Sequence, residues 1–201
     1  MVLRFNLGTI LKNYNRVFLI KASKAFTAPI FTSRSLASAG RIDVIVRSII
    51  SALTPVHRYE TAIMAILEGP PNPPLLLVVA GNEVEGIPLS EREMGEIILK
   101  VLNGNKINGF YLAKISFKKI ILQIISILRG KVLYMHEEGK DFRYMKEFKV
   151  FVLGDHLGID KDTEAFMENL GIPKASLGPL PYFTSHCITL IHEELDRMND
   201  D

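Results

Sequence analysis

The sequence has very little of the residues from which disulfide bonds and many metal sites are built. Only one of its 201 residues is a cysteine, Cys187, and none is a tryptophan. A single cysteine excludes an internal disulfide and a CxxC metal site, and it suits a reducing compartment. His186 and His192 are six positions apart, whereas two metal ligands on one helix face are four apart. The sequence therefore predicts no metal centre.

Long apolar runs are also missing. Leu75–Ala80 and Ile120–Leu122 are far shorter than the roughly 20 apolar residues that a membrane-spanning helix needs. Residues 1–20 are not typical of a signal peptide, because Lys12, Arg16 and three asparagines interrupt the apolar residues. We therefore expect no membrane association and a protein of the cytoplasm.

A glycine-rich nucleotide-binding turn is absent after the first predicted strand. That strand, Val17–Lys21, is followed by Ala22-Ser23-Lys24. A dehydrogenase that binds a dinucleotide carries a GxGxxG turn at this place. The sequence therefore excludes that common class of α/β enzyme.

Charges are present in both signs, but they are separated along the chain. Residues 1–58 carry an excess of eight positive charges and residues 100–149 an excess of seven. Residues 59–99 carry an excess of six negative charges and residues 150–201 an excess of seven. Basic blocks of this kind are typical of a surface for a polyanion, but solvated surface lysines give the same pattern. Charge alone leaves both interpretations open.

Segments with strand patterns alternate with segments with helix patterns. The predicted strands are Val17–Lys21, Thr61–Leu67, Leu75–Ala80, Phe110–Lys114, Val132–Met135, Val150–Leu153 and Lys174–Leu177. The predicted helices are Gly40–Leu53, 90–102, Phe117–Leu128, a helix capped by Asp160 or Asp162 that runs to Leu170, and Ser185–Met198. This alternation predicts an α/β fold with a mostly parallel sheet.

Six segments occur in the order and spacing of a known family. They are GRIDVIVRSI (40–49), EGPPNPP (68–74), LYMHEEGKD (133–141), FVLGDHLGI (151–159), SLGPLPY (176–182) and HCITLIHEELD (186–196). On these segments the chain resembles the archaeal tRNA (pseudouridine-N1)-methyltransferases of the SPOUT superfamily. The resemblance begins at about Val17. We therefore expect residues 17–201 to form a single methyltransferase domain, and residues 1–16 to be an N-terminal extension of unknown role.

The resemblance implies a fold, a cofactor and a substrate. The expected fold is a mostly parallel sheet with helices on both faces and a C-terminal trefoil knot, in a homodimer. The expected reaction is S-adenosylmethionine-dependent methylation of N1 of the pseudouridine at position 54 in the tRNA T-loop. Two alternatives stay open. One is a methyltransferase for a pseudouridine of small-subunit rRNA, and the other is a catalytically inactive RNA-binding dimer.

Three loops are implied to hold the cofactor. Core packing is an alternative role for Met135, and a plain turn is the alternative for the two glycines that bracket Asp155-His156. For Cys187 the resemblance implies a packing contact with the cofactor and no nucleophilic role. The implied cofactor-binding residues are Met135, Gly154, Gly158, Ala175, Ser176, Leu177, Gly178, Pro179, Leu180 and Cys187.

Methylation of pseudouridine N1 also requires that the N1 proton is lost. Asp43 is the first candidate for orienting or deprotonating the base, and Asp155 is the second. The alternatives are an ion pair between Asp43 and Arg47, which are four positions apart, and a simple turn aspartate at 155. Asn72 is expected to reach either an RNA base or a second subunit. The predicted RNA-binding residues are Arg34, Arg41, Arg47, Arg58 and Asn72.

Overall fold

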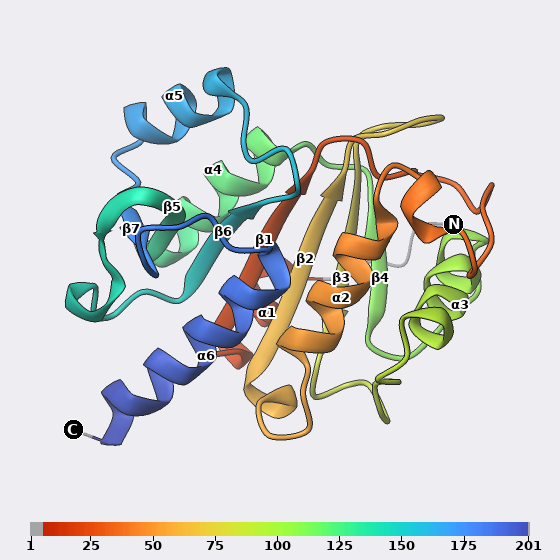
Figure 1. The fold of residues 1–201 in the computed structure, drawn as a ribbon, viewed down its shortest axis with the longest axis horizontal. Coiled ribbons are helices and arrows are strands. Elements are labelled where there is room, and N and C mark those ends of the chain that lie inside the picture. The colour runs from red at the N-terminus through yellow and green to blue at the C-terminus, as the bar shows by residue number, and fades with distance from the viewer. Residues whose placement is uncertain (1–5, 201) are drawn as a thin grey trace.

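The computed structural model describes residues 6–200, and Figure 1 shows their arrangement. The strands are β1 (Arg16–Ala22), β2 (Thr61–Leu67), β3 (Leu75–Ala80), β4 (Phe110–Ala113), β5 (Val132–Asp141), β6 (Val150–Gly154) and β7 (Lys174–Ser176). The helices are α1 (Leu7–Asn13), α2 (Ile42–Ala52), α3 (Glu91–Leu102), α4 (Phe117–Leu128), α5 (Lys161–Asn169) and α6 (Thr184–Asp200). Every strand and helix that the sequence predicts is present, and α1 is an addition.

The strands form one sheet in the order β4-β3-β2-β1-β6-β5-β7. β1 pairs in parallel with β2 and β6, and β5 pairs in parallel with β6 and β7. β3 runs antiparallel to both β2 and β4. The prediction of an α/β fold with a mostly parallel sheet is therefore confirmed.

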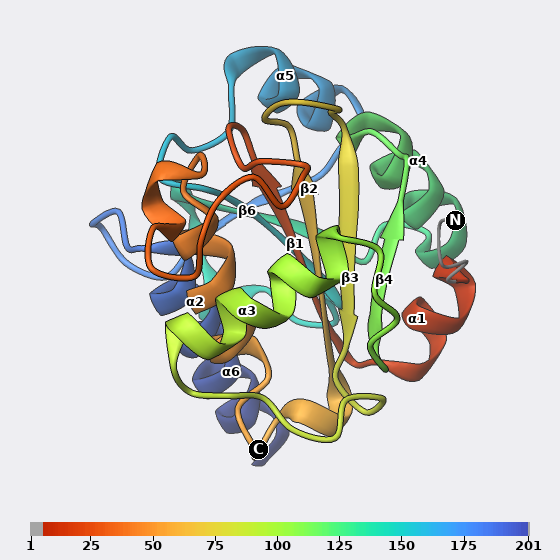
Figure 2. The same ribbon diagram turned by 90° about the vertical axis from the view of Figure 1, so that its right-hand side faces the viewer.

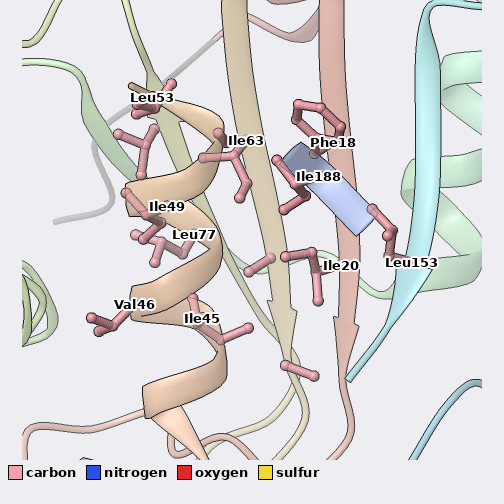
Figure 3. Packing of buried hydrophobic residues seen from close by; sticks show 14 of the residues in the cluster. Phe18, Ile20, Ile45, Val46, Ile49, Leu53, Ile63, Leu77, Leu153 and Ile188 are labelled. Atoms are coloured by element: carbon pink, nitrogen blue, oxygen red, sulfur yellow. The ribbon is translucent and has the colours of Figure 1, made fainter. Parts of the chain in front are cut away.

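Helices cover both faces of the sheet (Figure 2). Side chains of α2, α3 and α6 enter one buried cluster, and side chains of α1, α4 and α5 enter the other. α2 shows why: Ile45 and Ile49 lie on its apolar face, next to Ile63 and Leu77 of the sheet (Figure 3). Each such burial stabilises the fold by roughly 1.5–3 kcal/mol, so apolar spacing decides which face a helix buries.

Two features differ from the sequence prediction. The strand expected at Val132–Met135 continues to Asp141, with a register shift against β7 between Met135 and Lys140. The predicted end was wrong because the polar run after Met135 does not follow the apolar pattern of a strand. Gly139 allows the extension, since a Cβ there would lie 2.5 Å from the backbone of Ala175.

α1 is the second difference. It lies within the expected N-terminal extension, whose residues 1–5 are outside the described part. Asn6 caps the helix, and its side chain accepts a hydrogen bond from the Thr9 N–H. Ile10, Leu11 and Tyr14 are buried in the cluster that α4 also enters. No helix among residues 6–200 is long and apolar enough to cross a membrane.

Strand direction determines where a site can form. β1, β2, β5, β6 and β7 all run the same way, so the loops that follow them emerge at one edge of the sheet. In Figure 1 this is the upper edge, to which the arrowhead of β2 points. We call it the carboxyl edge. The connections 68–74 and 155–160, and the chain after Ser176, lie here.

Candidate functional site

A cavity of about 950 Å³ opens at the carboxyl edge. Its walls come from β5, from the loops after β6 and β7, and from the starts of α2, α5 and α6. A concave site of this size, at the ends of parallel strands, is where α/β proteins usually bind small molecules. The predicted site residues that line it are Arg41, Arg47, Met135, Gly154, Asp155, Gly158, Ala175, Ser176, Leu177, Gly178, Leu180 and Cys187.

Gly154 and Gly158 shape a tight turn after β6. An antiparallel bridge joins Asp155 to Gly158. A Cβ on Gly154 would lie 2.5 Å from the carbonyl carbon of Gly158, so the two backbones touch. Gly158 has a φ of +72°, which favours glycine, and a Cβ there would face open space. The turn therefore presents bare backbone to the cavity.

The carboxylate of Asp155 is fully engaged within the protein. Its side chain is 3% exposed. It accepts hydrogen bonds from the Ser23 N–H at 2.7 Å and from the Leu157 N–H at 2.8 Å. Asp155 thus stabilises the turn and joins it to the loop after β1. This is the structural role that was the alternative to a catalytic role for Asp155.

The loop after β7 is stiffened in a similar way. The hydroxyl of Ser176 donates to the Gly178 carbonyl at 2.6 Å and accepts from the Gly178 N–H at 3.1 Å. The Thr184 hydroxyl donates to the Gly154 carbonyl at 2.8 Å, which joins the start of α6 to the turn after β6. Pro179 is a predicted cofactor residue that does not line the cavity.

Met135 and Cys187 complete this part of the lining. Met135 belongs to the buried core and also faces the cavity, so its two expected roles are compatible. Cys187 lies in the first turn of α6. Burial raises the pKa of its thiol to about 11. The thiol is therefore neutral near pH 7, which suits packing and does not suit nucleophilic attack.

Asp43 lies behind the cavity wall, with two arginines in front of it. Its side chain accepts from Arg41 Nε at 2.9 Å and Nη2 at 3.0 Å, and it also pairs with Arg47. Burial acts to raise the pKa of Asp43, but the bonds from Arg41 and the charges of both arginines hold it below its usual value. Arg41 and Arg47 line the cavity, whereas Asp43 does not.

Arg41 is held in an unusual backbone conformation. It caps α2 with a φ of +68°, in the left-handed region that side chains rarely adopt. The preceding residue, Gly40, has a φ of +66°, and a Cβ on it would lie 1.6 Å from the Lys24 carbonyl oxygen. Such conformations cost about 1–3 kcal/mol and are often found at functional sites, although Arg129 and Glu147 also have a positive φ and do not line the cavity.

The remaining predicted RNA-binding residues do not line the cavity. Arg34 is exposed in the loop between β1 and α2. Asn72 is also at the carboxyl edge, where its N–H donates to the Thr27 hydroxyl at 2.8 Å. Arg58 precedes β2 and so lies at the opposite edge. There it donates to the Glu85 carbonyl at 2.8 Å and stacks on Tyr59.

A polar cluster in the lining was not among the residues predicted from the sequence. The Tyr134 hydroxyl donates to Glu164 at 2.7 Å, and His136 lies 3.6 Å from the same carboxylate oxygen. Burial and the nearby Glu164 carboxylate raise the pKa of Tyr134. The segment LYMHEEGKD contained the signal, but only the fold shows that α5 brings Glu164 to it.

One cluster among the described residues has the ligand types of a metal site. Ligand atoms of His57, Glu60 and Asp196 lie within 4.8 Å of one another. The guanidinium of buried Arg16 is 3.3 Å from Glu60 and 2.5 Å from Asp196. Its positive charge stands where a metal ion would have to bind. The cluster is therefore an ion-pair network at the edge opposite the cavity.

The chain is similar to known proteins over most of its length. A family described as "Putative SAM-dependent RNA methyltransferase" matches residues 15–200. A protein of Methanococcus maripaludis (strain C5) is 37% identical over 195 residues, covering 90% of this chain and 98% of its own length. A protein of Pyrococcus abyssi is 35% identical over 201 residues, covering 91% and 98%. Both are named tRNA (pseudouridine(54)-N(1))-methyltransferase.

A solved structure has a similar fold. It is Archaeoglobus fulgidus Nep1 bound to S-adenosylhomocysteine, with a TM-score of 0.67 and 12% sequence identity. The similarity covers 94% of this chain and 100% of that one. At this identity the likeness concerns the fold.

Proposed function

We propose that this chain, which belongs to the SAM-dependent RNA methyltransferase family, methylates N1 of the pseudouridine at position 54 of tRNA, using S-adenosylmethionine. One observation carries the proposal: a small-molecule cavity is lined by the loops that the family resemblance assigns to the cofactor. The names of relatives that match about 90% of the chain support the choice of substrate.

The residues of the cavity fit the cofactor. Bare backbone at Gly154 and Gly158 allows a ligand to approach closely, and Leu153, Leu177 and Leu180 supply apolar walls. When bound, S-adenosylmethionine supplies a methyl group on a positively charged sulfur. That methyl group would pass from the sulfur to N1, and N1 would lose its proton to water. The protein then has to align the two reactants, which needs little covalent chemistry.

Arg41 and Arg47 are the proposed contacts to the RNA, and Asp43 is the residue that positions them. Because both carboxylate oxygens of Asp43 are occupied and its pKa is lowered, Asp43 is a weak proton acceptor. We assign it the orienting role and not the deprotonating one. Asp155 is assigned to the turn that it braces, and the N1 proton is proposed to leave to water.

The proposal includes a trefoil knot at the C-terminus. α6 contacts α2 and the 3₁₀ turn η3 (Phe142–Tyr144), and these contacts place it on the face beneath the β5–β6 connection. In the proposed knot, the chain after Ser176 would pass through this connection before it reaches α6. A crystal structure whose backbone closes as a trefoil would support the knot, and an open path would refute it.

Residues 17–201 are proposed as one domain, and α1 packs against one side of it.

A homodimer is proposed as well. Leu157, Leu180 and Phe183 surround the cavity mouth and are exposed in a single chain. A second subunit would bury such residues and complete the site. Because tRNA is a cytoplasmic substrate, we place the protein in the cytoplasm.

The decisive experiment transfers labelled methyl groups from S-adenosylmethionine to three RNAs. They are tRNA with pseudouridine at position 54, the same tRNA with uridine there, and a small-subunit rRNA hairpin that contains pseudouridine. Nucleoside mass spectrometry should find N1-methylpseudouridine in the first RNA alone. Label in the hairpin alone would favour the rRNA enzyme. Cofactor and RNA binding without transfer would favour the inactive RNA-binding dimer.

A further inference from the structure

A group of cations at the carboxyl edge lies outside the cavity. Lys114 follows β4, and Lys118 and Lys119 lie in the first turn of α4; all three side chains are exposed. β4 is antiparallel to β3, which is antiparallel to β2, so β4 and β2 run in the same direction. The residues after β4 therefore reach the same edge as the cavity.

Hydrogen bonds link Lys114 to the loop that carries Arg41. The Lys114 ammonium donates to the Asn72 carbonyl, and the Asn72 N–H donates to Thr27. Thr27 belongs to the β1–α2 loop, in which Lys24 and Arg34 are exposed. Figure 2 shows the 68–74 connection and the start of α4 at the same end of the molecule as α5. We call Lys24, Arg34, Lys114, Lys118 and Lys119 the basic track.

The charges of the basic track are not neutralised by carboxylates of the described residues. None of its five members is within 4 Å of a carboxylate oxygen there, whereas Lys21 at the same edge pairs with Glu68 at 2.6 Å and Asp160 at 2.9 Å. Those two nearby acids are thus already occupied. α4 also has no acid in its first turn, in contrast to α3 and α5. Positive charge is unfavourable at the start of a helix, so helix formation does not favour these two lysines. Lys118 lies 5.2 Å from the centre of the Phe166 ring of α5, and its side chain stays exposed in this cation–π contact.

The basic track reaches further from the cavity, which the turn after β6 lines, than a single nucleotide does. From β6 to β4 the sheet takes four inter-strand steps of about 4.8 Å, or roughly 19 Å. An RNA arm that places one base in the cavity has further phosphates to both sides of it, and phosphate contacts supply most of the affinity of proteins for nucleic acids.

We propose that the basic track binds the phosphate backbone of the substrate RNA beyond the target nucleotide. This inference rests on the proposed function, because it takes RNA as the substrate. It assigns the β4–α4 junction to RNA binding, although the junction contributes nothing to the cavity lining. The contacts are electrostatic, so they are independent of base sequence and sensitive to salt.

The test compares two double variants of the same helix. Lys118→Gln with Lys119→Gln removes two charges at the start of α4. Arg129→Gln with Lys131→Gln removes two exposed charges just after its other end, and is the matched control. Binding is measured on a tRNA transcript without modified nucleosides over a range of salt concentrations, and cofactor binding is measured by calorimetry.

The first variant should weaken RNA binding about tenfold near physiological salt and lower the slope of log K against log salt by about 2. Cofactor affinity should stay unchanged, and Lys118→Arg with Lys119→Arg should restore binding. The control should bind RNA as the wild type does. Equal losses in the two variants, or an unchanged salt slope, would overturn the proposal. Because the transcript contains no pseudouridine, the result does not depend on methyl transfer, which tests the proposed function separately.

Discussion

Asp43 illustrates, at the scale of one residue, how neighbours decide what a carboxylate can do. Its pKa is held below the usual value, so the group is ionised throughout the neutral range. A folded-state pKa that is lowered adds stability above the unfolded pKa, and this stability is lost as the pH falls through the folded pKa. Asp43 therefore should not give rise to any change in activity between about pH 6 and pH 9.

Replacing Asp43→Asn should keep cofactor affinity and reduce turnover by about 10²-fold, because the arginines lose the charge that aligns them. Methyl transfer at saturating cofactor is the measurement, with Asp162→Asn as the control, since Asp162 is an exposed acid at the start of α5. Full turnover in the Asp43 variant would remove this residue from the mechanism.

Cys187 gives a second prediction for a single residue. With a pKa of about 11, its thiol should react with iodoacetamide slowly at pH 8, and the rate should rise until the pH reaches about 11. Bound S-adenosylhomocysteine should slow the reaction further, because Cys187 lines the cavity. Rapid labelling at pH 7 would contradict the neutral thiol. Cys187→Ala should retain most of the activity, as expected for a packing contact.

At the scale of secondary-structure elements, Asp160 joins α5 to β1. It caps α5 through the Thr163 N–H at 3.0 Å and pairs with Lys21 at 2.9 Å. Burial opposes its ionisation, but the bonds from Lys21 and Thr163 prevail and lower the pKa of Asp160 to about 2. Its pairing energy is therefore present above about pH 4 and is lost as the pH falls towards 2.

Asparagine caps helices as well as aspartate does, so two variants separate the two roles. Asp160→Asn should lower the free energy of unfolding by less than about 1 kcal/mol at pH 7, since the pair is partly exposed. Asp160→Ala should cost about 1 kcal/mol more through the lost cap. Urea denaturation measures both. The deficit of Asp160→Asn should shrink at pH 2.5, and an equal deficit at both pH values would contradict the ion-pair role.

Apolar periodicity was sufficient to predict the elements that bury one continuous face. β2, β3 and α4 have the predicted bounds, because apolar residues nearly fill β2 and β3 and recur along one face of α4. α1 was missed, since Ile10, Leu11 and Tyr14 are too few to mark a seven-residue helix. The polar second half of β5 was missed because its partner, β7, is distant in sequence.

The candidate site followed the same division. Glycines and the segments of the family resemblance identified the loops after β6 and β7, which do line the cavity. The sequence could not show that both carboxylate oxygens of Asp155 accept hydrogen bonds from backbone N–H groups. It also could not show that Arg58 lies at the edge of the sheet opposite the cavity. Those facts depend on strand order, and strand order is set by packing between distant segments.

At the scale of the whole molecule, the exposed residues at the cavity mouth predict a dimer. Phe183 is 74% exposed and Leu180 is 64% exposed. Phe183→Asp should convert the protein to a monomer and abolish methyl transfer, because a charge in an apolar interface is costly. Light scattering gives the mass. Val56→Asp is the control, because Val56 is 81% exposed and lies in the loop before β2, at the opposite edge. A wild-type monomer would refute the prediction.

The ion pair between Arg16 and Asp196 joins residues that are 180 positions apart. At 5–20 residues per second, a ribosome releases β1 on the order of 10 to 40 s before it has made α6. During that interval the guanidinium of Arg16 can pair with Glu60, but Asp196 of the last helix does not yet exist. A nascent chain that stops short of α6 thus retains a half-satisfied cation at the base of its first strand. We therefore expect cellular proteases to degrade incomplete translation products readily.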